Sequence, residues 1–231
     1  MIPLRDTVPT HSLPLMTYSL IALNVLLFLY EANLGPALDQ FLRDHGFVPA
    51  RYLYLSETEP WNLPARFGPM LTSIFLHGGW LHLISNMWVL WIFGDNVEDR
   101  LGGRRYLLFY LLSGAVAAYS QFRFAPFSGI PMVGASGAIA GVMGGYFILF
   151  PRARVVALVP VFFVLHVVTI PAVFFLGFWF LLQFFNGAFS LAEAHFMRGG
   201  VAWWAHVGGF VAGAVMITLF KPRRVARPYL R

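Results

Sequence analysis

Six apolar stretches, each close to the length that crosses a bilayer, constrain this chain more than any other feature. A helix needs about 20 mostly apolar residues to span the hydrocarbon core of a membrane. Only 11% of the 231 residues are charged, compared with about 25% in soluble domains, so most of the surface must face lipid. The sequence therefore predicts an all-α membrane protein, a bundle of six transmembrane helices. The predicted spans are about 15–33, 69–93, 105–122, 136–150, 171–187 and 203–220.

The fifth span is the least regular of the six. Residues 155–187 contain no charged side chain over 33 positions, which is longer than one span requires. Pro160 and Pro171 interrupt this stretch, and proline breaks an α-helix. We assign the span to 171–187 and interpret 155–170 as a partly inserted or interfacial segment. A hairpin of two spans is the alternative.

The basic residues orient the predicted bundle, because Lys and Arg concentrate in the cytoplasmic loops of membrane proteins. With the N-terminus inside, eleven basic residues fall on inner segments and five on outer ones, so both termini are predicted to be cytoplasmic. The inner set is Arg5, Arg100, Arg104, Arg105, Arg152, Arg154, Lys221, Arg223, Arg224, Arg227 and Arg231. The outer set is Arg43, Arg51, Arg66, Arg123 and Arg198.

This topology divides the chain into a cytoplasmic N-terminal segment (1–14), a membrane domain (15–220) and a basic cytoplasmic tail (221–231). We interpret the tail as an anchor at the anionic membrane surface, so the net charge of +6 does not predict a nucleic-acid partner. The N-terminus has no small-residue cleavage site after a short apolar core, and no signal peptide is expected.

Few polar side chains fall within the predicted spans, and each is a candidate for function because such groups are costly in lipid. No Asp or Glu lies well within a span, which disfavours an ion-coupled transporter. The zinc motif H-E-x-x-H and a pair of aspartates for acid–base catalysis do not occur in the spans, so no metal or other cofactor is expected. The polar set is His77, His82, Ser85, Asn86, Ser136 and His206.

The spacing of small residues predicts how these side chains meet. Gly137, Gly141 and Gly145 repeat every four residues, as do Ala205, Gly209 and Gly213. Such ladders let two helices approach closely in lipid. Ser136 adjoins the first ladder and His206 the second. Packing the ladders together would bring the hydroxyl near the imidazole, which is the first requirement of an activated serine.

A second requirement is a group of hydrogen-bond donors for the oxyanion. His82 and Asn86 are four residues apart and share a helix face. The backbone N–H groups at a helix start, here around Ser136, have no partner within the helix and carry positive partial charge. Each feature alone has a structural explanation: a serine can bond its own helix, and we assign His77 a structural role and His166 no role. The combination of all of them favours catalysis.

The segments "HLISN" (82–86), "GASGAIAG" (134–141) and "AHVGG" (205–209) together resemble the rhomboid family of intramembrane serine proteases. The resemblance covers roughly 15–220. It implies Ser136 as nucleophile and His206 as general base, with no carboxylate as a third member. It implies an oxyanion site formed by His82, Asn86 and the Ser136 N–H.

The resemblance further implies that Gly134 lets the backbone pass close to the site, while Gly137 allows the helix approach. Implied partners are the lipid bilayer and single-span transmembrane substrates, cut near the outer face. Phe178 and Trp179 on the fifth span would then be gate residues. The expected location is a prokaryotic plasma membrane, as an integral multi-pass protein.

Two departures from the family pattern affect the surroundings of the site. Some members carry a tyrosine four residues after the nucleophile, where this chain has Ala140, and some carry a Trp–Arg pair where this chain separates Trp61 from Arg66. Two other functions stay open: a non-catalytic rhomboid-like protein that binds membrane clients, and a small transporter or channel subunit.

Overall fold

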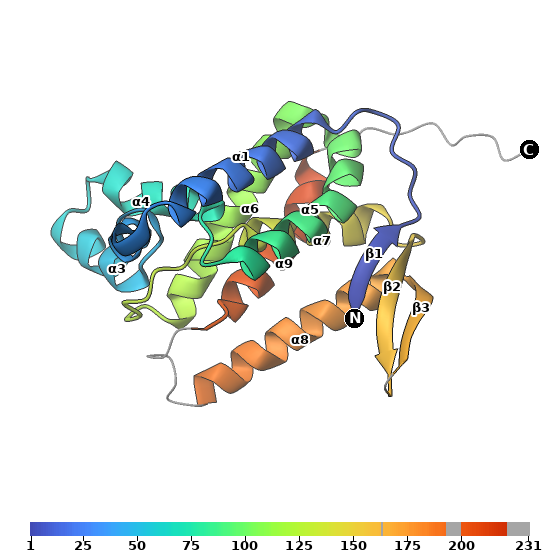
Figure 1. The fold of residues 1–231 in the computed structure, drawn as a ribbon. Helices are drawn as coiled ribbons and strands as arrows, with labels where there is room; N and C mark the ends of the chain where they lie inside the picture. The colour runs from blue at the N-terminus through green and yellow to red at the C-terminus, as the bar shows by residue number, and fades with distance from the viewer. Residues whose placement is uncertain (163, 193–199, 221–231) are drawn as a thin grey trace, which may run out of the picture.

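The computed structural model is mostly helical and describes residues 1–162, 164–192 and 200–220 (Figure 1). The predicted tail, 221–231, lies outside the described residues. The α-helices are α1 (Leu15–Ala32), α2 (Leu38–His45), α3 (Pro49–Thr58), α4 (Leu63–Thr72), α5 (Trp80–Leu101), α6 (Gly103–Phe124), α7 (Ser136–Leu149), α8 (Ala172–Ala192) and α9 (Trp203–Leu219). The shorter elements are η1 (Gly35–Ala37), η2 (Ser73–Phe75), β1 (Ile2–Asp6), β2 (Arg154–Val161) and β3 (Val164–Pro171).

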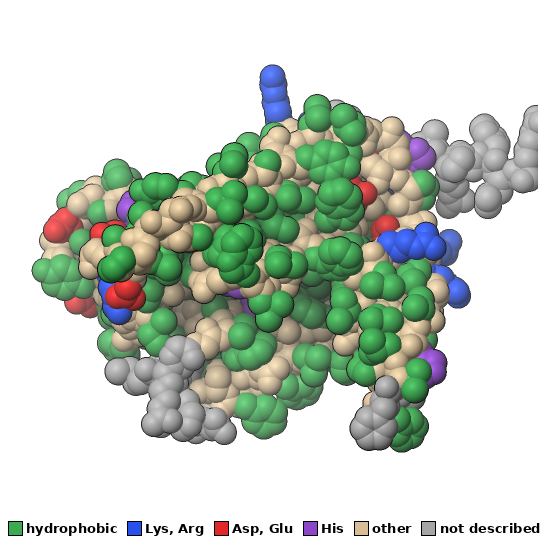
Figure 2. Space-filling model, viewed as in Figure 1, with side chains coloured by type: hydrophobic (Ala, Val, Ile, Leu, Met, Phe, Trp, Pro, Cys, Tyr) green, Lys and Arg blue, Asp and Glu red, His purple; other side chains and the backbone are tan. Residues whose placement is uncertain are grey.

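Long helices occupy all six predicted spans, although their apolar lengths differ. Among the described residues, α1 and α8 are long and apolar enough to cross a membrane by length and composition alone, while α7 and α9 are apolar but shorter. Apolar side chains cover the flank of the molecule, and charged side chains gather mainly at its two ends (Figure 2). The count of six membrane crossings therefore stays a prediction.

The predicted span over 69–93 is wrong at its start. Pro69 belongs to α4, which is followed by η2, and α5 begins only at Trp80. Two consecutive glycines, Gly78 and Gly79, precede α5, and glycine is a poor helix former. His82 therefore lies in the first turn of α5. The helix continues to Leu101 and includes Asp95.

The expectation of an all-α fold is also wrong, because β1, β2 and β3 form an antiparallel sheet in that order. The segment 155–170 is rich in valine, which favours strands, and it forms β2 and β3 rather than a second helical span. Pro160 lies beyond the residues of β2 that pair with β1, where no ladder hydrogen bond to β1 is lost. The sheet lies at the end of the bundle opposite α3 and α4 (Figure 1).

The N-terminal segment is fastened to α5. The Trp88 indole N–H donates to the Pro3 carbonyl at 2.6 Å. The buried Glu98 carboxylate accepts from the backbone N–H groups of Met16 and Thr17 at 2.9 and 2.7 Å. These are the first N–H groups of α1, which lack partners within their own helix. A side chain of α5 therefore caps α1.

The centre of the bundle is α7, whose residues from Gly137 to Tyr146 are all buried. A Cβ atom on Gly209 would lie 2.1 Å from the Gly137 carbonyl oxygen, and one on Gly213 would lie 1.9 Å from the Gly141 carbonyl oxygen. Backbone therefore touches backbone along α7 and α9. Because both pairs advance together in sequence, the two helices run parallel.

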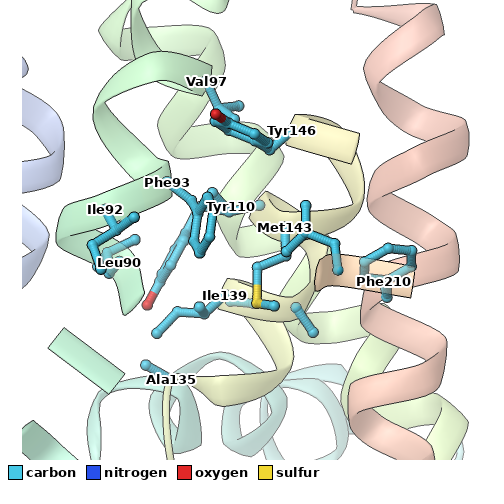
Figure 3. Packing of buried hydrophobic residues seen from close by; sticks show 14 of the residues in the cluster. Leu90, Ile92, Phe93, Val97, Tyr110, Ala135, Ile139, Met143, Tyr146 and Phe210 are labelled. Carbon is cyan, nitrogen blue, oxygen red and sulfur yellow. The ribbon is translucent and has the colours of Figure 1, made fainter. Parts of the chain in front are cut away.

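The other contacts fix an alternating direction for the remaining helices. The α6 residues Gly114 and Phe109 oppose Ala138 and Gly145 of α7, so α6 runs antiparallel to α7. The same comparison of contact pairs makes α8 antiparallel to α9 and α1 antiparallel to α5. Large side chains fill the space between α5, α6 and α7, among them Phe93, Tyr110, Ile139, Met143 and Tyr146 (Figure 3).

The close contact between α7 and α9 generates a stability prediction. We expect Gly213→Ala to lower the free energy of unfolding by about 1–3 kcal/mol, because the new methyl group meets backbone atoms that cannot rotate away. The matched control is Gly177→Ala in α8, where a Cβ atom meets nothing within 4 Å. The thermal midpoint in detergent, followed by tryptophan fluorescence, should fall in the first variant only. Equal midpoints for the two variants would contradict this packing.

Asp6 generates a prediction about pH. Burial is the main cause that raises the pKa of its carboxyl from 3.8 to about 6. The hydrogen bond from the Tyr146 hydroxyl lowers this pKa, and the nearby Asp95 raises it. Because the folded state then holds the proton more tightly than the unfolded chain, this group's contribution to stability falls as pH rises from about 4 to 6. Asp6→Asn should flatten that part of the stability–pH curve, measured as thermal midpoint. The exposed Asp44→Asn should not, and an unchanged slope in Asp6→Asn would refute the assignment.

Candidate active site

Ser136 and His206 lie within hydrogen-bond distance of each other. Ser136 is the first residue of α7, and His206 lies in the first turn of α9. The Ser136 Oγ atom is 2.8 Å from the His206 Nε2 atom. The parallel glycine contacts bring both helix starts to the same end of the bundle, one turn away from the Gly137–Gly209 contact. The small residues thus set the distance between the two side chains.

The other nitrogen of the imidazole has a partner that the sequence analysis missed. Gln183 of α8 places its Oε1 atom 2.7 Å from the His206 Nδ1 atom, and its side chain is 7% exposed. The Trp179 ring, one turn earlier on α8, lies 5.8 Å from the imidazole between centroids. The stretch 171–187 carries two amides, Gln183 and Asn186, and these were a usable signal, because a polar group in a membrane helix usually faces the protein interior.

Gly134 lies where the loop before α7 passes beside α5. Its φ angle is +121°, a conformation that side chains rarely adopt, and a Cβ atom would lie 2.6 Å from both the Cε1 and Nε2 atoms of His82. The Gly134 N–H donates to the Ser73 carbonyl at 2.9 Å, which holds the loop in place. Glycine is therefore the residue that this backbone requires.

His82 and Asn86 extend from α5 toward the same cavity as Ser136. Asn86 is buried, and its Nδ2 donor has no hydrogen-bond partner among the described residues. A buried donor without a partner is costly in a folded protein, so Asn86 is a candidate for binding a ligand. The loop residue His77, 1% exposed, contacts the His82 ring at 5.2 Å between centroids and donates its backbone N–H to Glu31.

One cavity of about 680 Å³, between α5, α6, α7 and α9, is lined by Ser136, His206, His82, Asn86 and Gly134. None of its described lining residues is charged. In the described parts of the chain, no group of three or more His, Cys, Asp or Glu side chains could hold a metal ion. The cavity thus combines serine hydroxyls, the imidazoles of His82 and His206, and the amides of Asn86 and Gln121 with apolar side chains.

The two predicted gate residues lie differently on α8. Trp179 faces His206, whereas Phe178 is 48% exposed on the flank of the bundle. In the segment between α1 and α5, Trp61 is 90% exposed and Arg66 lies over the rings of Tyr52 and Phe67. Of the two gate candidates, only Trp179 therefore contacts His206.

The fold and the site define a class of protein. It is mostly helical, and a serine and a buried histidine meet in a cavity without charged residues among those described. Comparison with known families is consistent with that class: residues 64–223 match the family model described as "Rhomboid domain". The chain belongs to the rhomboid family, which confirms the resemblance carried by its three motifs.

Individual relatives support the same assignment. The chain is 38% identical over 132 residues, 57% of its length, to "Rhomboid protease GluP" of Bacillus subtilis, of which it covers 24%. It is 35% identical over 120 residues, 52% of its length, to "Rhomboid-like protein 11, chloroplastic" of Arabidopsis thaliana, covering 40% of that protein. It is 33% identical over 96 residues to "Presenilin-associated rhomboid-like protein A, mitochondrial" of Danio rerio, which is 40% of this chain and 25% of the relative. The chain thus spans under half the length of each.

Proposed function

We propose that this chain is an intramembrane serine endopeptidase that cuts single-span transmembrane substrates near the outer membrane face. The observation that carries the proposal is the 2.8 Å contact between Ser136 Oγ and His206 Nε2. Membership of the rhomboid family supports it, as does the name of the relative from Bacillus subtilis, a rhomboid protease. The proposed mechanism uses a Ser–His pair, and no carboxylate lines the cavity among the described residues.

The chemistry begins with transfer of the Ser136 proton to His206. As Oγ attacks the scissile carbonyl carbon, the Nε2 atom accepts the hydroxyl proton, and a tetrahedral oxyanion forms. The imidazolium then donates that proton to the leaving amine as the C–N bond breaks, which leaves an ester on Ser136. Water, deprotonated by the same imidazole, attacks the ester, and the released Oγ recovers its proton.

The oxyanion is stabilised by donors on two helices. Asn86 Nδ2 has no partner among the described residues, and His82 lines the same cavity. The backbone N–H of Ser136 opens α7, where N–H groups lack partners within the helix and carry positive partial charge. Gly134 lets the loop pass beside His82, so that these donors converge on the position of the substrate carbonyl.

The direction of the helices supports six crossings with both termini cytoplasmic. Ser136, His82 and His206 all lie near the starts of parallel helices, which supports a site toward one membrane face. The positive-inside rule favours the outer face. The strands β2 and β3 then lie at the inner interface, where the 94% exposed Phe162 meets lipid.

The relatives include chloroplast and mitochondrial proteins. For this chain we propose a prokaryotic plasma membrane.

Ser136→Ala tests the nucleophile. We expect the purified variant to cleave a single-span substrate at least about 10⁴-fold more slowly than the wild type, because loss of a nucleophile leaves only transition-state binding. The control is Ser19→Ala, an exposed serine of α1 that bonds its own helix. Cleavage is followed by gel electrophoresis and mass spectrometry of the fragments. Equal cleavage by wild type and Ser136→Ala would refute Ser136 as the nucleophile. No cleavage by either protein across several substrates would leave the non-catalytic, client-binding function.

Asn86→Ala tests the oxyanion site. Removing one such donor costs about 10²–10³-fold in kcat, and we expect a loss of that size with KM changed little, because the contact forms in the transition state. Asn33→Ala, at the exposed end of α1, is the matched control and should keep wild-type kinetics. A loss confined to KM would show that Asn86 binds the ground state instead.

A further inference from the structure

We propose that Gln183 is a positioning residue that holds the imidazole of His206 in the tautomer that can act as a base. The inference rests on the proposed function and adds a third side chain to the Ser–His pair. It starts from the 2.7 Å contact between Gln183 Oε1 and His206 Nδ1, both on buried side chains. Gln183 comes from α8 and His206 from the neighbouring, antiparallel α9.

The direction of this hydrogen bond determines where the imidazole proton lies. An amide oxygen can only accept, so the bond to Gln183 requires the proton to be on Nδ1. The Nε2 atom then has a free lone pair, which faces Ser136 Oγ at 2.8 Å. In the other tautomer, Nε2 would carry the proton and could not accept the one from Ser136. Gln183 therefore selects the tautomer that catalysis needs.

The contact does for this site what a buried aspartate does in a Ser-His-Asp triad, without a charge. A carboxylate at this depth in a membrane is expensive, whereas a neutral amide with its oxygen satisfied is not. A buried amide among apolar side chains still costs free energy unless it is bonded. The flanking Leu182 and Phe184 are apolar and partly exposed, so packing alone gives no reason for glutamine at position 183.

A second contact from the same face of α8 fixes the ring. Trp179 and Gln183 are four residues apart and share that face. The Trp179 ring lies 5.8 Å from the imidazole at an interplanar angle of 35°. On α7, one turn after Ser136, Ala140 has only a methyl group. Orientation of the base therefore depends on α8 remaining packed against α9.

The test compares two substitutions at one position in the purified full chain. Gln183→Met removes the acceptor and keeps the length of the side chain, whereas Gln183→Glu keeps an oxygen acceptor. The control is Leu181→Met, on the exposed side of α8. Each protein is assayed for kcat and KM with a single-span substrate and for the labelling rate of Ser136 by a fluorophosphonate.

We expect Gln183→Met to lower kcat and the labelling rate by about 10- to 100-fold, part of the 10²–10⁴-fold that a positioned base contributes. KM should change less than about twofold, and Gln183→Glu should recover most of the loss. Nitrogen-15 NMR of labelled histidine should show the Nδ1–H tautomer of His206 in the wild type and a mixture in Gln183→Met. The His206 signals are identified by their absence in His206→Ala.

Wild-type rates in Gln183→Met, an unchanged tautomer, or no recovery in Gln183→Glu would each overturn the proposal. Thermal midpoints check folding, and Gln183→Leu replaces Gln183→Met if the latter does not fold. The failure of the proposed function has a different signature. In that case the wild type neither labels nor cleaves, while the NMR spectra still report whether Gln183 sets the tautomer.

Discussion

The contact between the backbones of α7 and α9 is the constraint on which the rest of the site depends. A Cβ atom on Gly213 would lie 1.9 Å from the Gly141 carbonyl oxygen, so no other side chain fits between the helices at that point. In lipid, helices associate by close packing and hydrogen bonding rather than by the hydrophobic effect. The short interhelical distance therefore stabilises the fold and sets the 2.8 Å separation between Ser136 and His206.

Three other helices complete the arrangement around that contact. From α5 come the donors His82 and Asn86, and α6 closes the opposite face of α7. From α8 come Trp179 and Gln183, which reach the far side of the imidazole. The N-terminal segment and the sheet hold the other end of the bundle. Their contacts run through Trp88, Glu98 and β2. The candidate site thus lies at one end of the helices, and the contacts of the N-terminal segment and the sheet lie toward the other end.

Features that repeat along a helix could be predicted from the sequence. The points along the chain where a helix begins or where strands replace a helix could not. The glycine ladders place Ser136 beside His206 because one period of four residues fixes a whole helix face. The start of α5 was missed because the apolar run through 69–79 has the composition of a span but contains Pro69 and the Gly78–Gly79 pair. The strands at 154–171 were missed because valine-rich apolar segments suit both a strand and a buried segment. Gln183 was missed because the sequence does not show which of the two amides of 171–187, Gln183 or Asn186, faces the site.

The central claim is that packing of α7 on α9 activates one serine among those of the chain. The most direct measurement is the site of covalent modification by a fluorophosphonate in detergent, read by tandem mass spectrometry of the wild type and of His206→Ala. The account predicts a single adduct on Ser136 that disappears in His206→Ala. An adduct on a different serine, or one on Ser136 that forms equally fast without His206, would contradict it.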